Sequence, residues 1–374
     1  MATLTRMDTS VIGQWWWTVD RWTLLAIGLL IAIGGLMTLA ASPAVAERIG
    51  YTSFHFAQRQ LIYMAPALAA MFAISLMTPR GIRRLSAIGL VASLILTLAT
   101  LFLGPETKGA TRWLSLGPLS VQPSEFVKPF FVIFAAWMFA EQKRNEGLPG
   151  NLISIAVFAV IVTLLLAQPD VGMAIVVSGV WCAQFFMAGL PVFWVGGLAA
   201  LSIVGVVCGY FFIPHVTSRI DRFLDPTSGD SFQIDTALAA FGNGGLLGLG
   251  PGEGVVKRVL PDAHSDFIFA VAGEEYGLFA CLSIVALFAF VVLRGLARLL
   301  EEENLFHLLA AGGLLILFGL QAVINMGVNL HLLPTKGMTL PFISYGGSSL
   351  MALAVAMGML LALTRKRPRV GGLS

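Results

Sequence analysis

Charged side chains are scarce in this sequence. Asp, Glu, Lys and Arg make up only 11% of the 374 residues, whereas hydrophobic residues make up 57%. An ordinary globular domain has roughly 25% charged residues. A soluble enzyme, a disordered regulator and a secreted disulfide scaffold are therefore excluded, because there is too little polar surface to wet several compact domains. Most of the chain must face lipid.

Cysteine is also rare, and common nucleotide and metal motifs are missing. Cys182, Cys208 and Cys281 lie far apart in apolar stretches without metal-ligand spacing, so we interpret them as small buried hydrophobes. The sequence has no P-loop and no HExxH helix, which leaves ATP-driven transport and zincin chemistry unsupported. A net charge of +3 is too small to indicate a nucleic-acid partner.

Long apolar runs dominate what is present. A helix that crosses the hydrocarbon core needs about 20 largely apolar residues, and the chain has about ten such stretches. The pattern predicts an all-α polytopic membrane protein, a bundle of about ten transmembrane helices. The predicted spans cover residues 23–43, 59–77, 85–103, 124–140, 152–167, 170–190, 191–213, 267–292, 306–330 and 342–364.

The distribution of Lys and Arg sets the predicted orientation, because these side chains resist translocation. Basic residues occur in loops on one side, which we assign to the cytoplasm: Arg6, Arg21, Arg80, Arg83, Arg84, Lys143, Arg144, Arg294 and Arg298. We therefore expect a cytoplasmic segment 1–22, a single transmembrane domain 23–364 and a basic cytoplasmic tail 365–374. The large periplasmic loop 214–266 joins spans seven and eight, and we expect it to fold onto the bundle with a short amphipathic helix around 231–242.

The first polar cluster lies at the outer end of the fourth span, in Gln122-Pro123-Ser124-Glu125-Phe126-Val127-Lys128-Pro129. Glu125 and Lys128 are three residues apart, on one helical face, and can pair. Alternatively, Ser124 is the N-cap of a helix and Glu125 interacts with the helix dipole. That alternative leaves the positive charge of Lys128 misplaced in a first turn. Because ionisable groups at bilayer depth are costly, we favour a functional pair.

The second cluster closes the long outer loop and opens the eighth span, with Asp262, His264, Ser265 and Asp266. Capping of the helix by Ser265 or Asp266 is the structural alternative. Capping needs only one acceptor, whereas four polar side chains crowd within a single turn, which favours a reactive carboxylate at the membrane surface. Glu274 and Glu275 follow, and at least one of these neighbours must point into the protein, for structural hydrogen bonding or for chemistry.

The third cluster spans the outer ends of the last two spans. Gln321, Asn325 and Asn329 recur at every fourth residue as a polar stripe, a pattern that commonly joins neighbouring helices by hydrogen bonds. The run Gly346-Gly347-Ser348-Ser349 either lets backbones approach closely or leaves a broken helix whose N–H groups can meet an anion.

A short outer loop before the fourth span carries a cation beside an aromatic ring, Arg112 and Trp113. An interfacial Trp is expected at this depth whatever the function. The guanidinium of Arg112 suits a phosphate group and a loop carbonyl equally well.

These motifs, in this order, resemble the SEDS family of bacterial peptidoglycan polymerases. The resemblance extends over roughly residues 20–365 and rests on GATRW, on QPSE followed by Lys128, on DAHSDFIFAVAGEEYG and on LPFISYGGSS. GLGPGEG before VKRVLPDAHSDF, and LLPTKGMTLPFISYGGSSL, are more similar to the branch of the family that acts in cell division than to the elongation branch.

The resemblance implies a glycosyltransferase that polymerises lipid II. The 4-hydroxyl of one disaccharide attacks the anomeric carbon of another and displaces undecaprenyl pyrophosphate, which forms a β-1,4 bond with inversion. The family's essential aspartate matches Asp266, its cavity-lining Glu and Lys match Glu125 and Lys128, and its Arg-Trp pair matches Arg112 and Trp113. Ser265 stands where Thr is commoner in the family.

This chemistry suits the residues. Pyrophosphate leaves as a stable anion, so one carboxylate acting as general base on the acceptor hydroxyl suffices, and Asp266 is the candidate. Cations would stabilise the leaving group: Lys128, Arg112, Lys257 and Arg258, or a divalent metal, Mg or Mn, although no carboxylate cluster dedicated to a metal is evident. The other predicted substrate-binding residues are His264, Ser344, Gly346 and Ser348.

The resemblance also implies partners and a location. The expected partners are lipid II, a class B penicillin-binding protein with transpeptidase activity and other divisome proteins, in the bacterial inner membrane at the division septum. Two alternatives remain. A lipid II flippase would need polar residues that continue into the cytoplasmic half, where few occur, and a non-catalytic scaffold would leave the cluster around Asp266 unexplained.

Overall fold

The chain is almost wholly helical. The computed structural model describes residues 10–106, 110–117, 119–145, 147–189, 232–334 and 337–365, together with isolated positions between 190 and 231. The helices are α1 (Val11–Thr18), α2 (Arg21–Arg48), α3 (His55–Ser75), α4 (Pro79–Leu103), α5 (Pro123–Arg144), α6 (Gly150–Ala167), α7 (Val171–Met187), α10 (Phe232–Gly244), α11 (Ile268–Leu299), α12 (Leu305–Asn329) and α13 (Gly347–Leu363), with a short 3-10 turn Val256–Arg258. A small antiparallel hairpin, β1 (Leu114–Leu116) and β2 (Leu119–Val121), precedes α5.

The helices follow the predicted spans closely. Among the described residues, six helices are long and apolar enough to cross a membrane, namely α2, α4, α5, α6, α11 and α12, while α7 and α13 are shorter apolar helices. The tenth span begins later than predicted, because residues 342–346 are not helical and α13 starts at Gly347. The predicted seventh span, 191–213, lies largely outside the described residues, and so does the first part of the outer loop. The short helix expected around 231–242 is α10.

Three helices form the centre of the bundle. Of the most apolar stretch of each helix, 78% is buried in α5 and 67% in α12, against 22% in α6 and 28% in α4. Every residue of α13 except Gly347 and Met351 is buried, and α13 packs against α3, α5 and α12. The peripheral helices leave large apolar side chains exposed, such as Ile88 and Leu293. Such an all-round apolar surface suits lipid rather than water.

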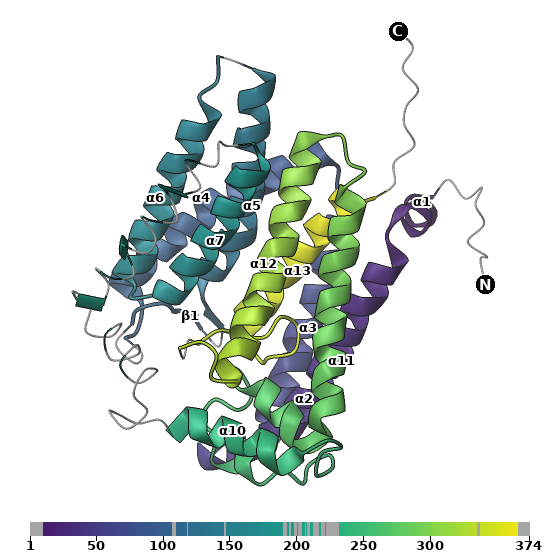
Figure 1. Ribbon diagram of the computed structural model, residues 1–374, viewed down its shortest axis with the longest axis vertical. Coiled ribbons are helices and arrows are strands. Elements are labelled where there is room, and N and C mark those ends of the chain that lie inside the picture. The colour runs from purple at the N-terminus through teal and green to yellow at the C-terminus, as the bar shows by residue number, and fades with distance from the viewer. Residues whose placement is uncertain are drawn as a thin grey trace.

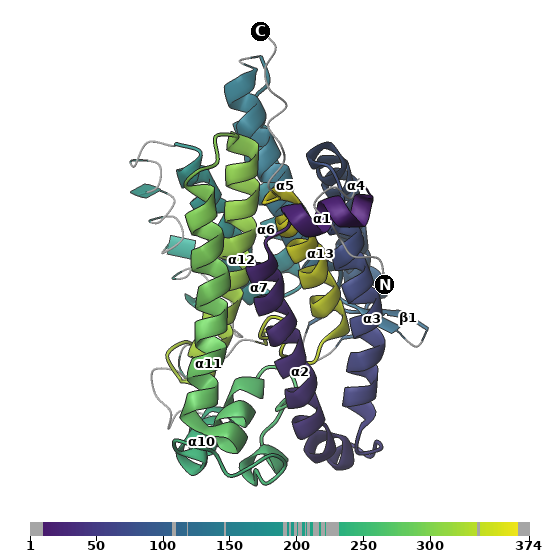
Figure 2. The same cartoon turned by 90° about the vertical axis from the view of Figure 1, so that its right-hand side faces the viewer.

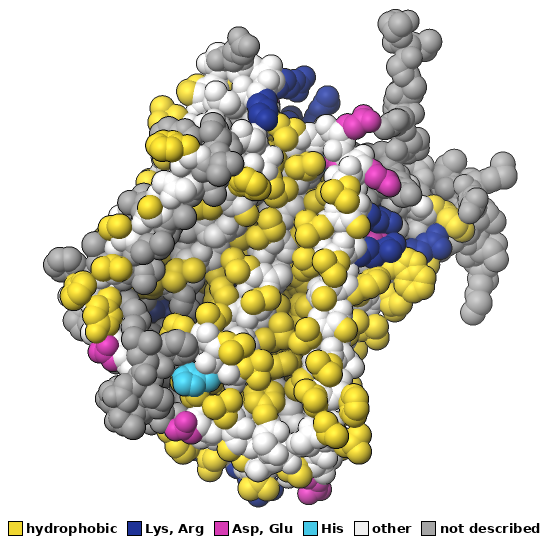
Figure 3. Space-filling model, viewed as in Figure 1, with side chains coloured by type: hydrophobic (Ala, Val, Ile, Leu, Met, Phe, Trp, Pro, Cys, Tyr) yellow, Lys and Arg dark blue, Asp and Glu magenta, His cyan; other side chains and the backbone are white. Residues whose placement is uncertain are grey.

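The two ends of the bundle differ in charge. α10 lies at one end and α1 at the other, in both views (Figures 1 and 2). In the space-filling view, hydrophobic side chains cover the middle, and most of the visible Lys and Arg lie toward the end that carries α1 (Figure 3). There Asp20, the N-cap of α2, accepts hydrogen bonds from Arg294 at 2.8 and 3.0 Å. Burial raises the pKa of Asp20, but hydrogen bonds from Arg294 and Thr23 and the charges of Arg298 and Arg294 outweigh it and lower that pKa overall.

α11 is broken near its N-terminal end. Gly277 has φ 74° and ψ −172°, a backbone conformation that L side chains avoid. Residues 244–250 fill the break: the N–H groups of Leu249 and Gly250 donate to the carbonyls of Glu274 and Glu275, and Leu278 N donates to Gly245 O at 3.0 Å. Non-helical backbone at membrane depth persists only where protein satisfies its polar groups. This exchange of hydrogen bonds meets that requirement.

Candidate active site

The predicted ion pair between Glu125 and Lys128 is present. Lys128 Nζ lies 2.8 Å from Glu125 Oε2 in the first turns of α5, and both residues are buried. The alternative in which Ser124 caps the helix is wrong. The N-cap is Gln122, and Pro123 occupies the first helical position, where its missing N–H costs nothing.

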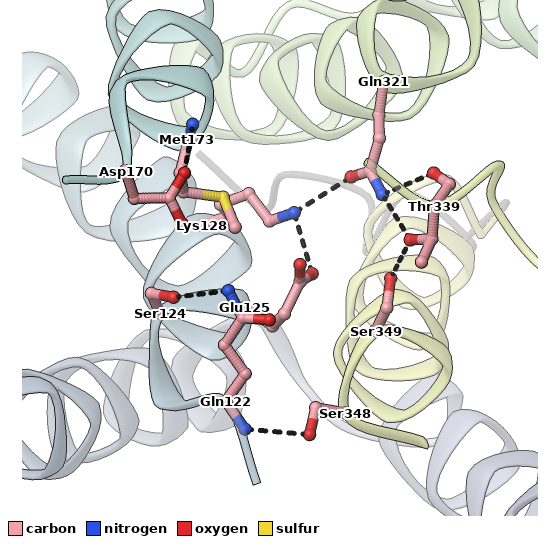
Figure 4. A network of polar contacts seen from close by, with 10 residues as sticks. All are labelled: Gln122, Ser124, Glu125, Lys128, Asp170, Met173, Gln321, Thr339, Ser348 and Ser349. Atoms are coloured by element: carbon pink, nitrogen blue, oxygen red, sulfur yellow. Dashed lines mark hydrogen bonds and ion pairs between the residues drawn. The ribbon is translucent and has the colours of Figure 1, made fainter. Parts of the chain in front are cut away.

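The ion pair continues into a polar network that reaches two other helices (Figure 4). Lys128 Nζ donates to Gln321 Oε1 of α12 at 3.0 Å, and Gln321 Nε2 donates to the carbonyl of Thr339 at 3.2 Å. The hydroxyl of Thr339 lies 2.6 Å from that of Ser349 on α13. We call Glu125, Lys128, Gln321, Thr339 and Ser349 the polar network. It joins α5, α12 and α13 at the centre of the bundle.

Ser348 and Ser344 have structural partners beside this network. The hydroxyl of Ser348 accepts from Gln122 N at 2.9 Å, which ties the start of α13 to the start of α5. Ser344 Oγ accepts from Leu340 N at 2.7 Å and donates to Ser265 O at 2.5 Å. Gly346 is the N-cap of α13, and no side chain caps that end. The segment 337–346 is thus bonded both to itself and to the residue before Asp266.

Asp266 lies two residues before the start of α11, and its backbone is held by side chains of α12. Asn325 Nδ2 and Asn329 Nδ2 both donate to the carbonyl of Asp266, each at 2.9 Å. Neither Ser265 nor Asp266 is the N-cap of α11, so the capping alternative is wrong. The N-cap is Phe267, and Asn329 Oδ1 accepts from Ala270 N at 3.1 Å. The amide from α12 thus does what Ser265 and Asp266 were alternatively expected to do.

The polar stripe of α12 therefore does more than join helices to one another. Gln321 bonds Lys128, whereas Asn325 and Asn329 bond the peptide of Asp266. The carboxylate of Asp266 faces the 337–346 segment, since a Cβ built on Gly337 would lie 3.2 Å from Asp266 Oδ2. The structure thus brings the first, second and third sequence clusters together along one helix.

His264 lies among aromatic rings. Its ring centroid is 4.2 Å from that of Phe56 and 5.3 Å from that of Tyr345, and its carbonyl accepts from Tyr345 N at 2.9 Å. Burial lowers the pKa of His264 to about 4. The negative charge of Asp262 opposes this lowering, and the positive charge of Arg48 adds a smaller lowering. The imidazole is therefore neutral at pH 7 and packs against the rings of Phe56 and Tyr345.

Lys257 is not part of the polar network. Its ammonium pairs with Glu275 and donates to the carbonyls of Ala40 and Gly252, each at 3.1 Å. Glu274 accepts from the N–H groups of residues 255, 256 and 257 at 2.7–3.0 Å. Both glutamates are buried, whereas the sequence required only that at least one of them point into the protein. We call Lys257, Glu274, Glu275 and residues 244–250 the α11 clamp. Arg258, next to Lys257, is exposed.

Arg112 bonds loop carbonyls, one of its two expected roles. Its guanidinium donates to the carbonyls of Gln168 at 3.4 Å and Pro169 at 2.5 Å, and lies 3.6 Å from the carboxylate of Asp170. Trp113 is half-buried beside it. Asp170 also caps α7 by accepting from Met173 N at 3.2 Å. Sequence reasoning missed Asp170 and Thr339, although Asp170 directly precedes an apolar run, where an N-cap is expected.

No ready-made metal centre is found in the described part of the chain. Its residues contain no group of three or more His, Cys, Asp and Glu side chains close enough to hold an ion.

Fold and site together define a class: a polytopic membrane protein with a carboxylate just before α11 and a buried lysine network at its centre. The chain belongs to the FtsW/RodA/SpoVE family, whose model, described as "Cell cycle protein", matches residues 21–369. The resemblance to this family drawn from the motifs is confirmed.

Relatives and solved structures agree with this assignment. The chain is 46% identical to the "Probable peptidoglycan glycosyltransferase FtsW" of Caulobacter vibrioides over 370 residues, which cover 99% of this chain and 95% of that protein. It is 34% identical to the protein of the same name from Legionella pneumophila, over 92% and 90% of the two chains.

Among solved structures, one similar chain comes from a work described as "Structural coordination of polymerization and crosslinking by a peptidoglycan synthase complex". It has a TM-score of 0.74 and 26% identity, over 92% of this chain and 97% of that one. The rod shape determining protein RodA of Thermus thermophilus has a TM-score of 0.68 and 26% identity, over 93% and 97%.

Proposed function

We propose that this protein is a peptidoglycan glycosyltransferase that polymerises lipid II into glycan strands for the septal wall of dividing cells. The names of its relatives support this activity. The structural observation that supports it most is the carboxylate of Asp266 on a peptide fixed by α12, the helix that also bonds Lys128. A bundle needed only as a scaffold has no use for this arrangement.

Asp266 acts as the general base in the proposed reaction. Its carboxylate takes the proton of the acceptor 4-hydroxyl while that oxygen forms a bond to the anomeric carbon of the donor. The bond from that carbon to the pyrophosphate oxygen breaks on the opposite face, so the configuration inverts. The electron pair leaves with undecaprenyl pyrophosphate, which is stable as an anion and needs no general acid.

Lys128 supplies positive charge to the developing leaving group. An ammonium has three N–H donors, and among the described residues Lys128 Nζ has two acceptors, Glu125 and Gln321. Its remaining donor suits a pyrophosphate oxygen, in a buried setting where such an interaction is strong. Lys257 and Arg112 bond protein atoms instead, so we give them structural roles.

The proposal extends to place and partner. The transmembrane domain 23–364 lies in the bacterial inner membrane at the septum, with both termini in the cytoplasm and the end that carries Asp266 in the periplasm. A class B penicillin-binding transpeptidase cross-links the strands that it makes, with other divisome proteins. The likeness to a chain of a peptidoglycan synthase complex supports such a partner.

Purified protein with its transpeptidase partner, given lipid II, tests the proposal. We expect glycan polymer from the native chain and none from Asp266→Ala, while Asp235→Ala, an exposed acid on α10, polymerises normally. Lipid II translocation in vesicles without any polymer would instead favour a flippase. Full polymerisation by Asp266→Ala would refute the assignment of the base.

A further inference from the structure

Two buried amides converge on one oxygen atom at the proposed catalytic position. Asn325 and Asn329, on successive turns of α12, both donate to the carbonyl of Asp266 at 2.9 Å. Asn325 is 2% exposed and Asn329 is fully buried. A carbonyl oxygen has two lone pairs, so these two bonds use its full capacity as an acceptor.

Each amide also bonds a second piece of the site. Asn325 Nδ2 donates to the carbonyl of Met338 at 2.6 Å, next to Thr339 of the polar network. Asn329 Nδ2 donates to the carbonyl of Asn325 at 2.9 Å, and its Oδ1 accepts from Ala270 N in the first turn of α11. The two amides therefore fix the Asp266 peptide relative to α11, α12 and the 337–346 segment at once.

The position of a carboxylate on a one-carbon stem follows closely from its backbone. An aspartate has only two side-chain torsions, so a peptide plane held by two hydrogen bonds leaves its carboxylate a small range of positions. Misplacement of a catalytic group by about 1 Å costs about 10²-fold in rate. A general base must also lie within hydrogen-bond reach of the proton that it takes.

We propose that Asn325 and Asn329 are positioning residues, which hold the peptide of Asp266 so that its carboxylate meets the acceptor hydroxyl. The inference rests on the proposed function, in which Asp266 is the base. Gln321, one turn earlier, holds Lys128, so α12 sets the placement of the base relative to the cation. The stripe is thereby a device for catalysis as well as for packing.

Steady-state kinetics of the full-length chain with its transpeptidase partner tests the proposal. We expect Asn325→Ala and Asn329→Ala to lower kcat by about 10²-fold, with KM for lipid II within about twofold of the native value. A native kcat in both single variants would overturn the proposal, and so would a loss expressed in KM alone.

Gln184 supplies a matched control. It is fully buried, and its Nε2 donates to two carbonyls, those of Val132 at 2.9 Å and Leu309 at 3.0 Å, far along the chain from Asp266. Gln184→Ala should lower the unfolding temperature as the asparagine variants do and leave kcat unchanged. An equal loss of kcat in Gln184→Ala would reduce Asn325 and Asn329 to packing residues.

A second measurement does not depend on turnover. In a chain whose three native cysteines are changed to alanine, Asp266→Cys and Gly337→Cys place two thiols close together, because a Cβ on Gly337 lies 3.2 Å from the native carboxylate. We expect disulfide formation to slow when Asn325→Ala or Asn329→Ala is added. An unchanged rate would overturn the positioning role, whereas normal polymerisation by Asp266→Ala would overturn only the proposed base.

Discussion

Two buried lysines of this bundle, Lys257 and Lys128, differ in what surrounds them. Lys257 directs its ammonium to Glu275 and to the carbonyls of Ala40 and Gly252, so three protein acceptors meet its three donors. Lys128 bonds Glu125 and Gln321, two side chains, and in the described part of the chain these are its acceptors. The same residue type is thus satisfied entirely by the fold at one place and incompletely at the other.

The difference separates structure from chemistry without reference to any substrate. A lysine that is bonded to two main-chain carbonyls far apart in sequence holds segments together, here α2 and the loop before α11. A lysine with a donor to spare, beside a carboxylate and an amide that can rearrange, suits the binding of an anion. Charge and burial alone do not distinguish the two, because each is almost fully buried.

The largest expected effect is on folding, at Lys257. Lys257→Met leaves the buried carboxylate of Glu275 without its partner, which costs about 3–5 kcal/mol of unfolding free energy. Thermal unfolding in detergent should show a large fall in the transition temperature. The double variant Lys257→Met/Glu275→Leu should recover most of the loss, and a single variant as stable as the native chain would show that the α11 clamp does not need this pair.

The second effect is on catalysis, at the ion pair between Lys128 and Glu125. Lys128→Met/Glu125→Gln removes both charges together, so the fold should persist while the rate of lipid II polymerisation falls by about 10²-fold or more. Lys257→Met/Glu275→Leu, the corresponding double variant in the α11 clamp, should polymerise at close to the native rate. The comparison between the two lysines breaks down if the two double variants lose activity equally.

A smaller effect, on the pH dependence of stability, concerns His264. Burial lowers its pKa from 6.5 to about 4, so the unfolded chain binds the proton more readily. The contribution of neutral His264 to the free energy of unfolding is complete above the pKa that His264 has in the unfolded chain. It is lost as the pH falls toward the pKa of His264 in the folded protein, and the loss is at most about 3 kcal/mol. Unfolding free energies measured from pH 7 to pH 4 should show this loss, and His264→Phe should flatten the curve. An equally steep curve for His264→Phe would assign the dependence to other groups.

Much of the bundle was predictable from the composition, the length of the apolar runs and the spacing of the charged residues. Apolar runs near 20 residues located the helices, and the spacing of Glu125 and Lys128 predicted their ion pair. The residues at which helices begin and end were harder to predict. The sequence 342–346 is apolar enough to pass for helix, but Phe342 has φ 64° and α13 begins only at Gly347.

The partners of the predicted site residues could not be read from the sequence, because they come from distant segments. Nothing local to Lys257 indicates Glu275 or Ala40 as its acceptors. Likewise, the spacing of Asn325 and Asn329 shows that they share a face, but only the fold shows that this face meets the peptide of Asp266. Spacing specifies which side chains point together, whereas tertiary packing decides what they touch.

The most direct test of the whole account compares Asp266→Asn with the native protein. The amide has the shape of the carboxylate but cannot accept the proton of a sugar hydroxyl. With the proposed transpeptidase partner and lipid II, the variant should still bind substrate while glycan synthesis falls by about 10²–10⁴-fold. Glycan synthesis by Asp266→Asn at the native rate would contradict the account.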